Sequence, residues 1–406
     1  VKQLLSHIRV LDLSRVLAGP WSAQMLADLG AEVIKVERPG PGDDTRAWGP
    51  PFLKTPTGGS TQESGYYLGA NRGKRSITVD ISQPQGQEII RELAAKVDIV
   101  LENYKVGTLK RYGLDYESLR AINPKLIYCS ITGFGQTGPR AEQPAYDFLI
   151  QAMGGLMSVT GERDDLPGGG PQKIGIPLID LITGTYASVG MLAALANREV
   201  TGEGEYIDMA MLDVQVSLLS NQAMNYLMSG KTPVRRGNAH PNIQPQDVFK
   251  CADGDLVLVV GNDGQFAKLC QTLGAPDLAN DPRFDTNPNR VRHQNELRPL
   301  LDALFAAKTR AEWSDLLGQA QVPCGPINSI PEALADPQIV HRQMLRQLPH
   351  PTAGTVPQLV TPFRFGQAEI RTDQAPPLLG QHTDEVLGEL GLSAERIQQL
   401  RQDAII

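Results

Sequence analysis

The chain has 406 residues, of which 41% are hydrophobic and 20% are charged, and its formal net charge is −7 at pH 7. This composition is typical of a folded globular protein and excludes a mainly disordered chain. The length suggests two domains, since domains commonly run to roughly 100–200 residues. An acidic protein has no overall attraction for nucleic acid or for an anionic membrane, so neither is expected as a partner, and an anionic ligand requires a local basic site.

The cysteines and histidines predict neither disulfides nor a metal centre. The four cysteines are scattered without a Cys-x-x-Cys pair, and the six histidines show no metal-ligand spacing. No long apolar run suggests a signal peptide or a membrane span. We therefore expect a protein without bound metal in the cytoplasm, or in mitochondria if a transit peptide has been removed.

Short apolar runs alternate with helical patterns over the first 130 residues. The runs predict buried parallel strands at residues 8–13, 32–36, 98–102 and 126–131. Helices are expected between them: Pro20 marks a start, Gly30 a stop, and Ser82 is expected to cap a helix. This alternation predicts a doubly wound α/β domain.

The second half of the chain changes character. A helical segment at 181–197 is rich in small residues, which permit close helix packing, and residues 230–250 are rich in Pro, Gly and Asn. A smaller α+β unit is expected after that segment. Residues 376–406 predict a loop that leads into helices.

Nine motifs follow one another in a single order along the chain. They are VLDLSRVLAGP, LGAEVIKVERPGPGDDTR, NRGKRSITVD, VLENYKVGTLKRYGL, CSITGFGQTGP, GIPLIDLITG, TGEGEYIDMAMLD, VPCGP and PPLLGQHTDEVL. With them the chain resembles, almost end to end, the class III coenzyme A transferases, which include the formyl-CoA, carnitine and bile-acid CoA-transferases. WGPPF, LGQHT and RRGNAHPNIQPQDVFK are most similar to the succinate:hydroxymethylglutarate CoA-transferases, which act on dicarboxylates.

The resemblance implies a particular architecture. Members of the family are interlocked homodimers, and each chain has a large Rossmann-like α/β domain built from both chain ends and a smaller α+β domain. In this sequence we place the large domain at 1–205 and 335–406 and the small domain at 222–330. The active site is expected where the large domain of one chain meets the small domain of the other.

Asp180, in GIPLIDLITG, occupies the position of the family's catalytic aspartate. The family's carboxylate attacks an acyl-CoA thioester, forms a mixed anhydride and then becomes an aspartyl-CoA thioester. An aspartate at a helix start is otherwise more often a cap, and the helix N-terminus is expected to favour its ionised form. The expected donor is succinyl-CoA, with no tightly bound cofactor. The acceptors left open are glutarate, hydroxymethylglutarate, itaconate and citramalate.

The resemblance also implies a set of residues that contact CoA. They are Val16, Leu17, Ala18, Arg38, Val79, Asn103, Tyr104, Arg111, Tyr146 and Asp147. Formyl-CoA transferases carry glutamine where this chain has Leu17, which disfavours formyl or oxalate chemistry. Without the family context, the two arginines would be interpreted as solvated surface residues. The basic cluster Arg72, Lys74 and Arg75 is interpreted as a solvated loop, with phosphate binding as the alternative.

A dicarboxylate needs a cationic partner for its second carboxylate. Arg235, Arg236 and His240, in PVRRGNAH, are the residues proposed for this role, because guanidinium groups bind carboxylates through paired hydrogen bonds. A pair of solvated arginines at a domain crossing is the alternative.

Two other functions compete with CoA transfer. An α-methylacyl-CoA racemase needs a base on each face of the substrate, and this chain has Tyr146 where the racemases carry histidine. A non-catalytic dinucleotide-binding protein would require a Gly-x-Gly-x-x-Gly motif after the first strand, which the chain lacks. Transfer of CoA is the favoured function.

Overall fold

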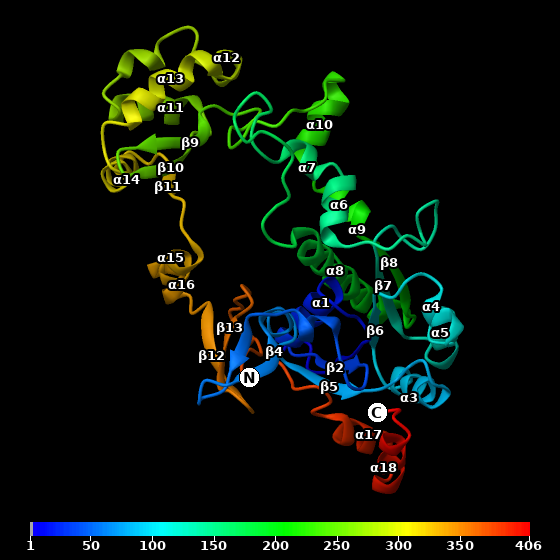
Figure 1. Cartoon of the computed structure of the whole chain (residues 1–406). Helices are drawn as coiled ribbons and strands as arrows, with labels where there is room; N and C mark the ends of the chain where they lie inside the picture. The colour runs from blue at the N-terminus through cyan, green and yellow to red at the C-terminus, as the bar shows by residue number, and fades with distance from the viewer. Residues whose placement is uncertain (1–2) are drawn as a thin grey trace. The chain divides into compact units, whose positions relative to one another are not determined.

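The structure, a computed structural model, describes residues 3–406 and contains two compact units, which are described separately (Figure 1). The large unit consists of the chain up to Gly155, Ile174–Ser220 and Gln338–Ile406. The small unit consists of Leu156–Lys173 and Asn221–Pro337. Both chain ends therefore contribute to the large unit.

The large unit contains a six-stranded parallel sheet. Its strands are β1 (Arg9–Asp12), β2 (Glu32–Glu37), β5 (Lys74–Thr78), β6 (Ile99–Glu102), β7 (Ile127–Thr132) and β8 (Glu205–Ala210), in the order β5-β2-β1-β6-β7-β8. The four strands expected from apolar runs are confirmed. Their residues are almost all buried, as expected for parallel strands covered on both faces.

Helices cover both faces of this sheet. On one face, side chains of α3 (Pro84–Ala94), α5 (Tyr116–Ile122), α17 (Thr383–Leu390) and α18 (Ala394–Gln402) share an apolar core with the strands. On the other, α1 (Ala18–Asp28) packs on α8 (Leu178–Thr201) and on the central strands. In Figure 1 the red C-terminal helices lie beside the blue and cyan N-terminal elements of the unit. The doubly wound α/β prediction is confirmed.

The strand order reverses between β1 and β6. From β1 the chain winds outward to β2 and β5, whereas β6, β7 and β8 extend the sheet in the other direction. In doubly wound sheets the loops after the two strands at such a switch point separate and leave a crevice at the strands' carboxyl ends. Leu13–Ala18 follow β1 and Asn103–Lys105 follow β6, so the topology predicts a ligand site between these segments.

The small unit is an α+β body. Strands β9 (Gln246–Cys251), β10 (Gly254–Val259) and β11 (Cys324–Pro326) form an antiparallel sheet in the order β11-β10-β9. Two helices pack on this sheet, α13 (Gln294–Phe305) and α14 (Arg310–Gln319). Helix α11 (Asp263–Thr272) packs on α14, and α12 (Asn287–Arg292) packs on α13. Phe249, Phe305 and Trp313 lie in its apolar core, where the rings of Phe249 and Phe305 stack with centroids 4.8 Å apart.

The remaining elements are short. The strands are β3 (Phe52–Lys54), β4 (Ser60–Ser64), β12 (Leu345–His350) and β13 (Gly354–Leu359). The α-helices are α2 (Gly65–Leu68), α4 (Thr108–Arg111), α6 (Asp147–Met153), α7 (Leu156–Val159), α9 (Met211–Ser217), α10 (Ser220–Ser229), α15 (Ile330–Ala335) and α16 (Pro337–His341). Two 3₁₀ turns, η1 (Asp44–Ala47) and η2 (Pro276–Ala279), complete the chain.

Two local expectations were wrong. Ser82 does not cap α3: the helix begins after Gln83 with Pro84 in its first turn, and the Ser82 hydroxyl donates instead to Asp80. The basic cluster is not a solvated loop, because Arg72 and Lys74 are 1% and 3% exposed. Each is neutralised by a carboxylate from a distant part of the sequence: Asp28 lies 2.7 Å from Arg72, and Asp12 lies 2.9 Å from Lys74.

Helix α8 is long and apolar enough to cross a membrane by length and composition. Half of its most apolar window is buried inside the protein, and its long contact with α1 makes it a core helix of the large unit. Gly184 allows this contact, since a Cβ there would lie 2.4 Å from the carbonyl oxygen of Ala18. The close packing expected from the small residues of this helix is confirmed.

Candidate active site

A cleft of about 170 Å³ lies at the switch point of the large unit. The segment after β1 and the segment after β6 form two of its walls, as the topology predicts. Its other walls come from the end of β7, the loop before α6 and the first turn of α8. The predicted site residues that line this cleft are Val16, Leu17, Ala18, Asn103, Tyr104, Tyr146 and Asp180.

The segment after β1 is held rigidly. Val16 has φ of 70°, a left-handed conformation that is a genuine outlier for a β-branched residue. The side-chain amide of Asn103 accepts from the N–H of Arg15 at 2.8 Å and donates to the carbonyl of Arg15 at 2.7 Å. Both polar groups of Asn103 therefore bind this segment, so its main effect is to fix the cleft wall.

Asp180 lies in the first turn of α8 and faces the cleft. It is 9% exposed, and its carboxylate accepts no hydrogen bond from any residue between 3 and 406. A buried carboxylate without hydrogen-bond donors is poorly stabilised in its charged form. Burial, followed by the nearby Asp147 carboxylate, raises the pKa of Asp180 to about 7. These two effects outweigh the stabilisation of the ionised carboxylate that was expected from the helix N-terminus.

The neighbouring residues Tyr146 and Asp147 point in different directions. Tyr146 lines the cleft and is 64% exposed. Asp147 is buried, and its carboxylate accepts from the N–H groups of Ile179 and Asp180 rather than facing the cleft. Of this pair, only Tyr146 has a side chain available to a ligand in the cleft.

Besides Asp147, three of the residues expected to contact CoA lie outside this cleft. Arg38 and Arg111 are exposed on the surface of the large unit, and neither forms an ion pair within residues 3–406. Val79 is 2% exposed and belongs to the apolar core, where it packs with residues of α3. The arginines therefore remain open to a phosphate, whereas the Val79 side chain is occupied by packing.

Sequence reasoning missed several residues of the cleft. Arg15 pairs with Asp44 at 3.0 Å and lies over the Tyr104 ring, while exposed Lys105 forms no ion pair in the described chain. Met211, at the start of α9, is buried and closes another wall. The switch-point rule could have identified Lys105, since it follows β6 by three residues.

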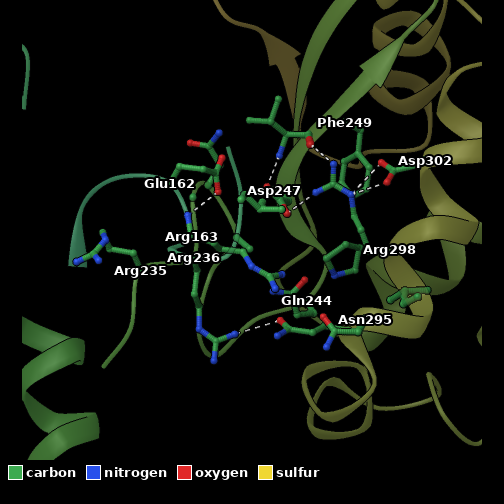
Figure 2. Close-up of a pocket in the computed structure, with 18 of the residues that line it drawn as sticks. Glu162, Arg163, Arg235, Arg236, Gln244, Asp247, Phe249, Asn295, Arg298 and Asp302 are labelled. Carbon is green, nitrogen blue, oxygen red and sulfur yellow. Dashed lines mark hydrogen bonds and ion pairs between the residues drawn. The ribbon is translucent and has the colours of Figure 1, made fainter. Parts of the chain in front are cut away.

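A second, larger cavity of about 740 Å³ lies within the small unit and is lined by four arginines (Figure 2). Figure 2 shows Arg298 beside Asp247 and Asp302, with which it forms ion pairs at 2.6 and 2.8 Å. Arg163 pairs with Asp165 at 2.6 Å. Most of the positive charge in this cavity is thus neutralised internally.

The three residues proposed for the distal carboxylate differ in their surroundings. Arg235 forms an ion pair with Asp164, so its charge is already compensated. Arg236 lines the cavity and donates to the side-chain oxygen of Gln294 at 3.2 Å, but no carboxylate within residues 3–406 pairs with it. His240 does not line the cavity, and burial lowers the pKa of its imidazole, which disfavours a positive charge. Arg236 is the strongest of the three for binding an anion.

No cluster of three or more His, Cys, Asp or Glu side chains arranged to hold a metal ion occurs within the described chain. The cleft is lined by the buried carboxylate of Asp180 at a helix start, by the phenol of Tyr146 and by the exposed Lys105. A carboxylate in this setting can act as a nucleophile toward an activated acyl group.

The chain belongs to CoA-transferase family III, whose model matches residues 5–383, and the protein is therefore a CoA-transferase. It is 50% identical over 389 residues to the succinate–glutarate CoA-transferase of Agrobacterium fabrum, covering 96% of both chains. It is 44% identical over 386 residues to the succinyl-CoA:glutarate CoA-transferase of Mus musculus, covering 95% of this chain and 86% of that protein.

Solved structures agree with this assignment. A crystal structure of a CaiB/BaiF family protein from Brucella suis superimposes with a TM-score of 0.82 at 49% identity, covering 94% of this chain and 98% of that chain. The resemblance inferred from the motifs is confirmed.

Proposed function

We propose that the enzyme transfers CoA from succinyl-CoA to a dicarboxylate, with glutarate as the first acceptor to test, and that Asp180 is the covalently acylated nucleophile. The observation that carries the mechanism is the Asp180 carboxylate, which lines the switch-point cleft, is buried and accepts no hydrogen bond from residues 3–406. The substrates are supported by the two relatives, which are named for succinate or succinyl-CoA and glutarate.

The first half of the reaction loads CoA onto the enzyme. A carboxylate oxygen of Asp180 attacks the thioester carbonyl of succinyl-CoA, the C–S bond breaks, and a mixed anhydride and CoA thiolate form. The thiolate then attacks the aspartyl carbonyl of the anhydride and releases succinate. The product is an aspartyl-CoA thioester, so the energy of the original thioester bond is conserved.

The second half reverses these steps with the acceptor. A carboxylate of glutarate attacks the aspartyl thioester carbonyl, giving a second mixed anhydride and the thiolate. Attack of the thiolate on the glutaryl carbonyl yields glutaryl-CoA and restores the Asp180 carboxylate. No step consumes water, which fits a nucleophile that is 9% exposed.

The surroundings of Asp180 suit this chemistry. A carboxylate that accepts no protein hydrogen bonds loses little stabilisation when it forms a neutral anhydride or thioester. A pKa of about 7 leaves a substantial ionised fraction at neutral pH and gives a more basic nucleophile than a solvated aspartate. Both properties come from burial in the first turn of α8.

CoA brings phosphates that need cationic partners on this acidic protein. Lys105, Arg38 and Arg111 are the exposed cations proposed for this role, since none is neutralised by a carboxylate within residues 3–406. Lys105 is the one that also lines the cleft. Substitution of Lys105 by Gln should raise the KM for succinyl-CoA and leave the KM for glutarate nearly unchanged.

Arg236 is proposed to bind the second carboxylate of the acceptor, because its guanidinium faces a cavity without a paired acid. Arg236→Gln should raise the KM for glutarate by about tenfold or more and have a much smaller effect on a monocarboxylate of similar length. The matched control is Arg163→Gln, since Arg163 lines the same cavity but is paired with Asp165. Equal increases in the KM for glutarate and for the monocarboxylate would show that Arg236 does not bind the second carboxylate.

We further propose that the protein is a homodimer. Large apolar side chains remain exposed on neighbouring helices of the large unit, including Tyr186 and Val189 of α8 and Val216 of α9. Such groups of exposed apolar residues are typical of protein–protein interfaces. Light scattering coupled to size-exclusion chromatography measures the oligomeric state directly.

A panel of dicarboxylates tests the proposed substrates. The purified protein is incubated with succinyl-CoA and glutarate, hydroxymethylglutarate, itaconate, citramalate or a monocarboxylate control, and the CoA products are identified by mass spectrometry. Glutaryl-CoA should form, and it should do so only with active protein. Transfer to the monocarboxylate at a higher kcat/KM than to every dicarboxylate would contradict the proposal.

A further inference from the structure

Helix α8, which carries Asp180, lacks a capping side chain from its own sequence. Its N-cap residue is Pro177, which offers no side-chain acceptor. The missing acceptor comes from α6: Oδ1 of Asp147 accepts from the N–H of Ile179 at 2.6 Å and from the N–H of Asp180 at 3.2 Å. Because the first N–H groups of a helix have no intrahelical partners, this carboxylate completes the first turn.

Asp147 is itself fixed by a buried side chain. Its Oδ2 accepts from the amide of Gln151 at 2.6 Å, and the amide oxygen of Gln151 accepts from the N–H of Ile174 at 2.9 Å. Asp147 is 8% exposed and Gln151 is fully buried. Both oxygens of Asp147 thus accept hydrogen bonds inside the protein, and this residue does not line the cleft.

We propose that Asp147 is a positioning residue for CoA transfer: it fixes the first turn of α8 and thereby directs the Asp180 carboxylate into the cleft. This inference rests on the proposed role of Asp180. It replaces the contact with CoA that the family resemblance implied for Asp147. A nucleophile aimed by a rigid first turn needs little reorganisation before it attacks the thioester carbonyl.

The charge of Asp147 has a second effect on Asp180. After burial, it is the neighbouring charge that raises the pKa of Asp180. The other acidic residues on elements packed against α8 are paired or exposed: Asp28 of α1 is paired with Arg72, and Glu205 and Asp208 of β8 and Asp213 of α9 are exposed. Tyr66, in α2, has a pKa raised to about 12 and stays neutral.

These contacts allow the two effects to be separated by substitution. Asp147→Ala removes both the cap and the charge. The double variant Asp147→Asn with Gln151→Glu retains every hydrogen bond, because the asparagine oxygen can accept from α8 while its amide donates to the new carboxylate, which also accepts from Ile174. The control is Asp213→Asn, which removes an exposed carboxylate from a helix that packs on α8.

The readouts are kcat, the KM for succinyl-CoA and the pH dependence of kcat/KM. Asp147→Ala should lower kcat by about tenfold or more while the KM for succinyl-CoA changes less than about twofold. The double variant should recover most of kcat, and the midpoint of its acid limb should lie below that of the wild-type enzyme because the negative charge has moved away from Asp180. Asp213→Asn should match the wild-type enzyme in all three.

Two results would overturn the inference. A raised KM for succinyl-CoA with unchanged kcat in Asp147→Ala would show that Asp147 contributes to CoA binding and does not position Asp180. A double variant that folds, as circular dichroism reports, but is as slow as Asp147→Ala would show that the hydrogen bonds do not carry the effect. If Asp147→Ala does not fold, the kcat of the double variant still tests the inference, since it should be close to that of the wild-type enzyme. Retained transfer in Asp180→Ala would instead contradict the proposed function itself.

Discussion

The backbone N–H of Val16 lies 3.3 Å from each carboxylate oxygen of Asp43, and Oδ2 of Asp43 also accepts from the ammonium of Lys35 at 2.9 Å. The side chains of Asp43 and Lys35 are completely buried. Burial acts against the charge of Asp43, but Lys35 and hydrogen bonds from Thr45 outweigh it and lower the pKa of Asp43 to about 2. A buried ion pair therefore holds the strained turn at the cleft wall.

Loss of the ion pair between Lys35 and Asp43 should strongly destabilise the folded protein. Asp43→Asn leaves the ammonium of Lys35 buried without its closest counter-charge, and we expect the free energy of unfolding to fall by about 3–5 kcal/mol. Asp44→Asn is the matched control: it breaks the exposed pair with Arg15 and should change that free energy by less than about 1 kcal/mol. Urea denaturation followed by circular dichroism measures both. Equal changes in the two variants would contradict this account of the turn.

Asp180 should destabilise the folded protein at alkaline pH. Its pKa is 3.8 as a reference and about 7 when folded, so the folded state binds its proton more tightly than the unfolded state. Stability then falls as pH rises from about 4 through 7, by up to about 4 kcal/mol in total. Asp180→Asn removes this penalty and should be more stable than the wild-type protein at pH 8, with less than half of the difference remaining at pH 5.

Thermal unfolding at the two pH values checks this prediction. Tyr66→Phe serves as a control, since a phenol with a pKa raised to about 12 does not ionise between pH 5 and pH 8. If the stability difference between Asp180→Asn and the wild-type protein does not vary with pH, the pKa of Asp180 is not raised in the folded protein.

Racemisation of 2-methylacyl-CoA should be absent. Proton removal beside a thioester needs a base on each face, and Tyr146 stands where racemases carry histidine. Tyr146 is exposed in the cleft, and its phenol does not replace the imidazole that serves as a general base in the racemases. A 2-methylacyl-CoA incubated with the enzyme in heavy water should keep its α-proton. Rapid deuterium incorporation with both enantiomers appearing would support the racemase alternative.

The sequence predicted the sheet well because its signal is local. Strands buried on both faces appear as short uninterrupted apolar runs. The run at 32–36 lies entirely within β2, and the run at 126–131 exceeds β7 only by Leu126. The burial of Arg72 and Lys74 could not be predicted in this way. It depends on Asp28 and Asp12, which lie far away in the sequence and become partners only when α1, β1 and β5 pack together.

The site was predicted in part for the same reason. Asp180 was found through a local motif, and it lines the switch-point cleft together with Val16, Leu17 and Ala18. The cap supplied by Asp147 spans 32 residues to Ile179, and no pattern within a single helix indicates it. The left-handed backbone conformation at Val16 could not be predicted either, because valine rarely adopts a positive φ.

The formation of an aspartyl-CoA thioester at Asp180 is the central claim, and covalent trapping tests it most directly. The enzyme is incubated with succinyl-CoA and then with hydroxylamine or borohydride, digested, and analysed by mass spectrometry, with Asp180→Asn as the control. We predict a hydroxamate or a reduced side chain at Asp180 in the peptide containing GIPLIDLITG, and no modification in the variant. Full transfer activity in Asp180→Ala, or an adduct on a different residue, would contradict the account.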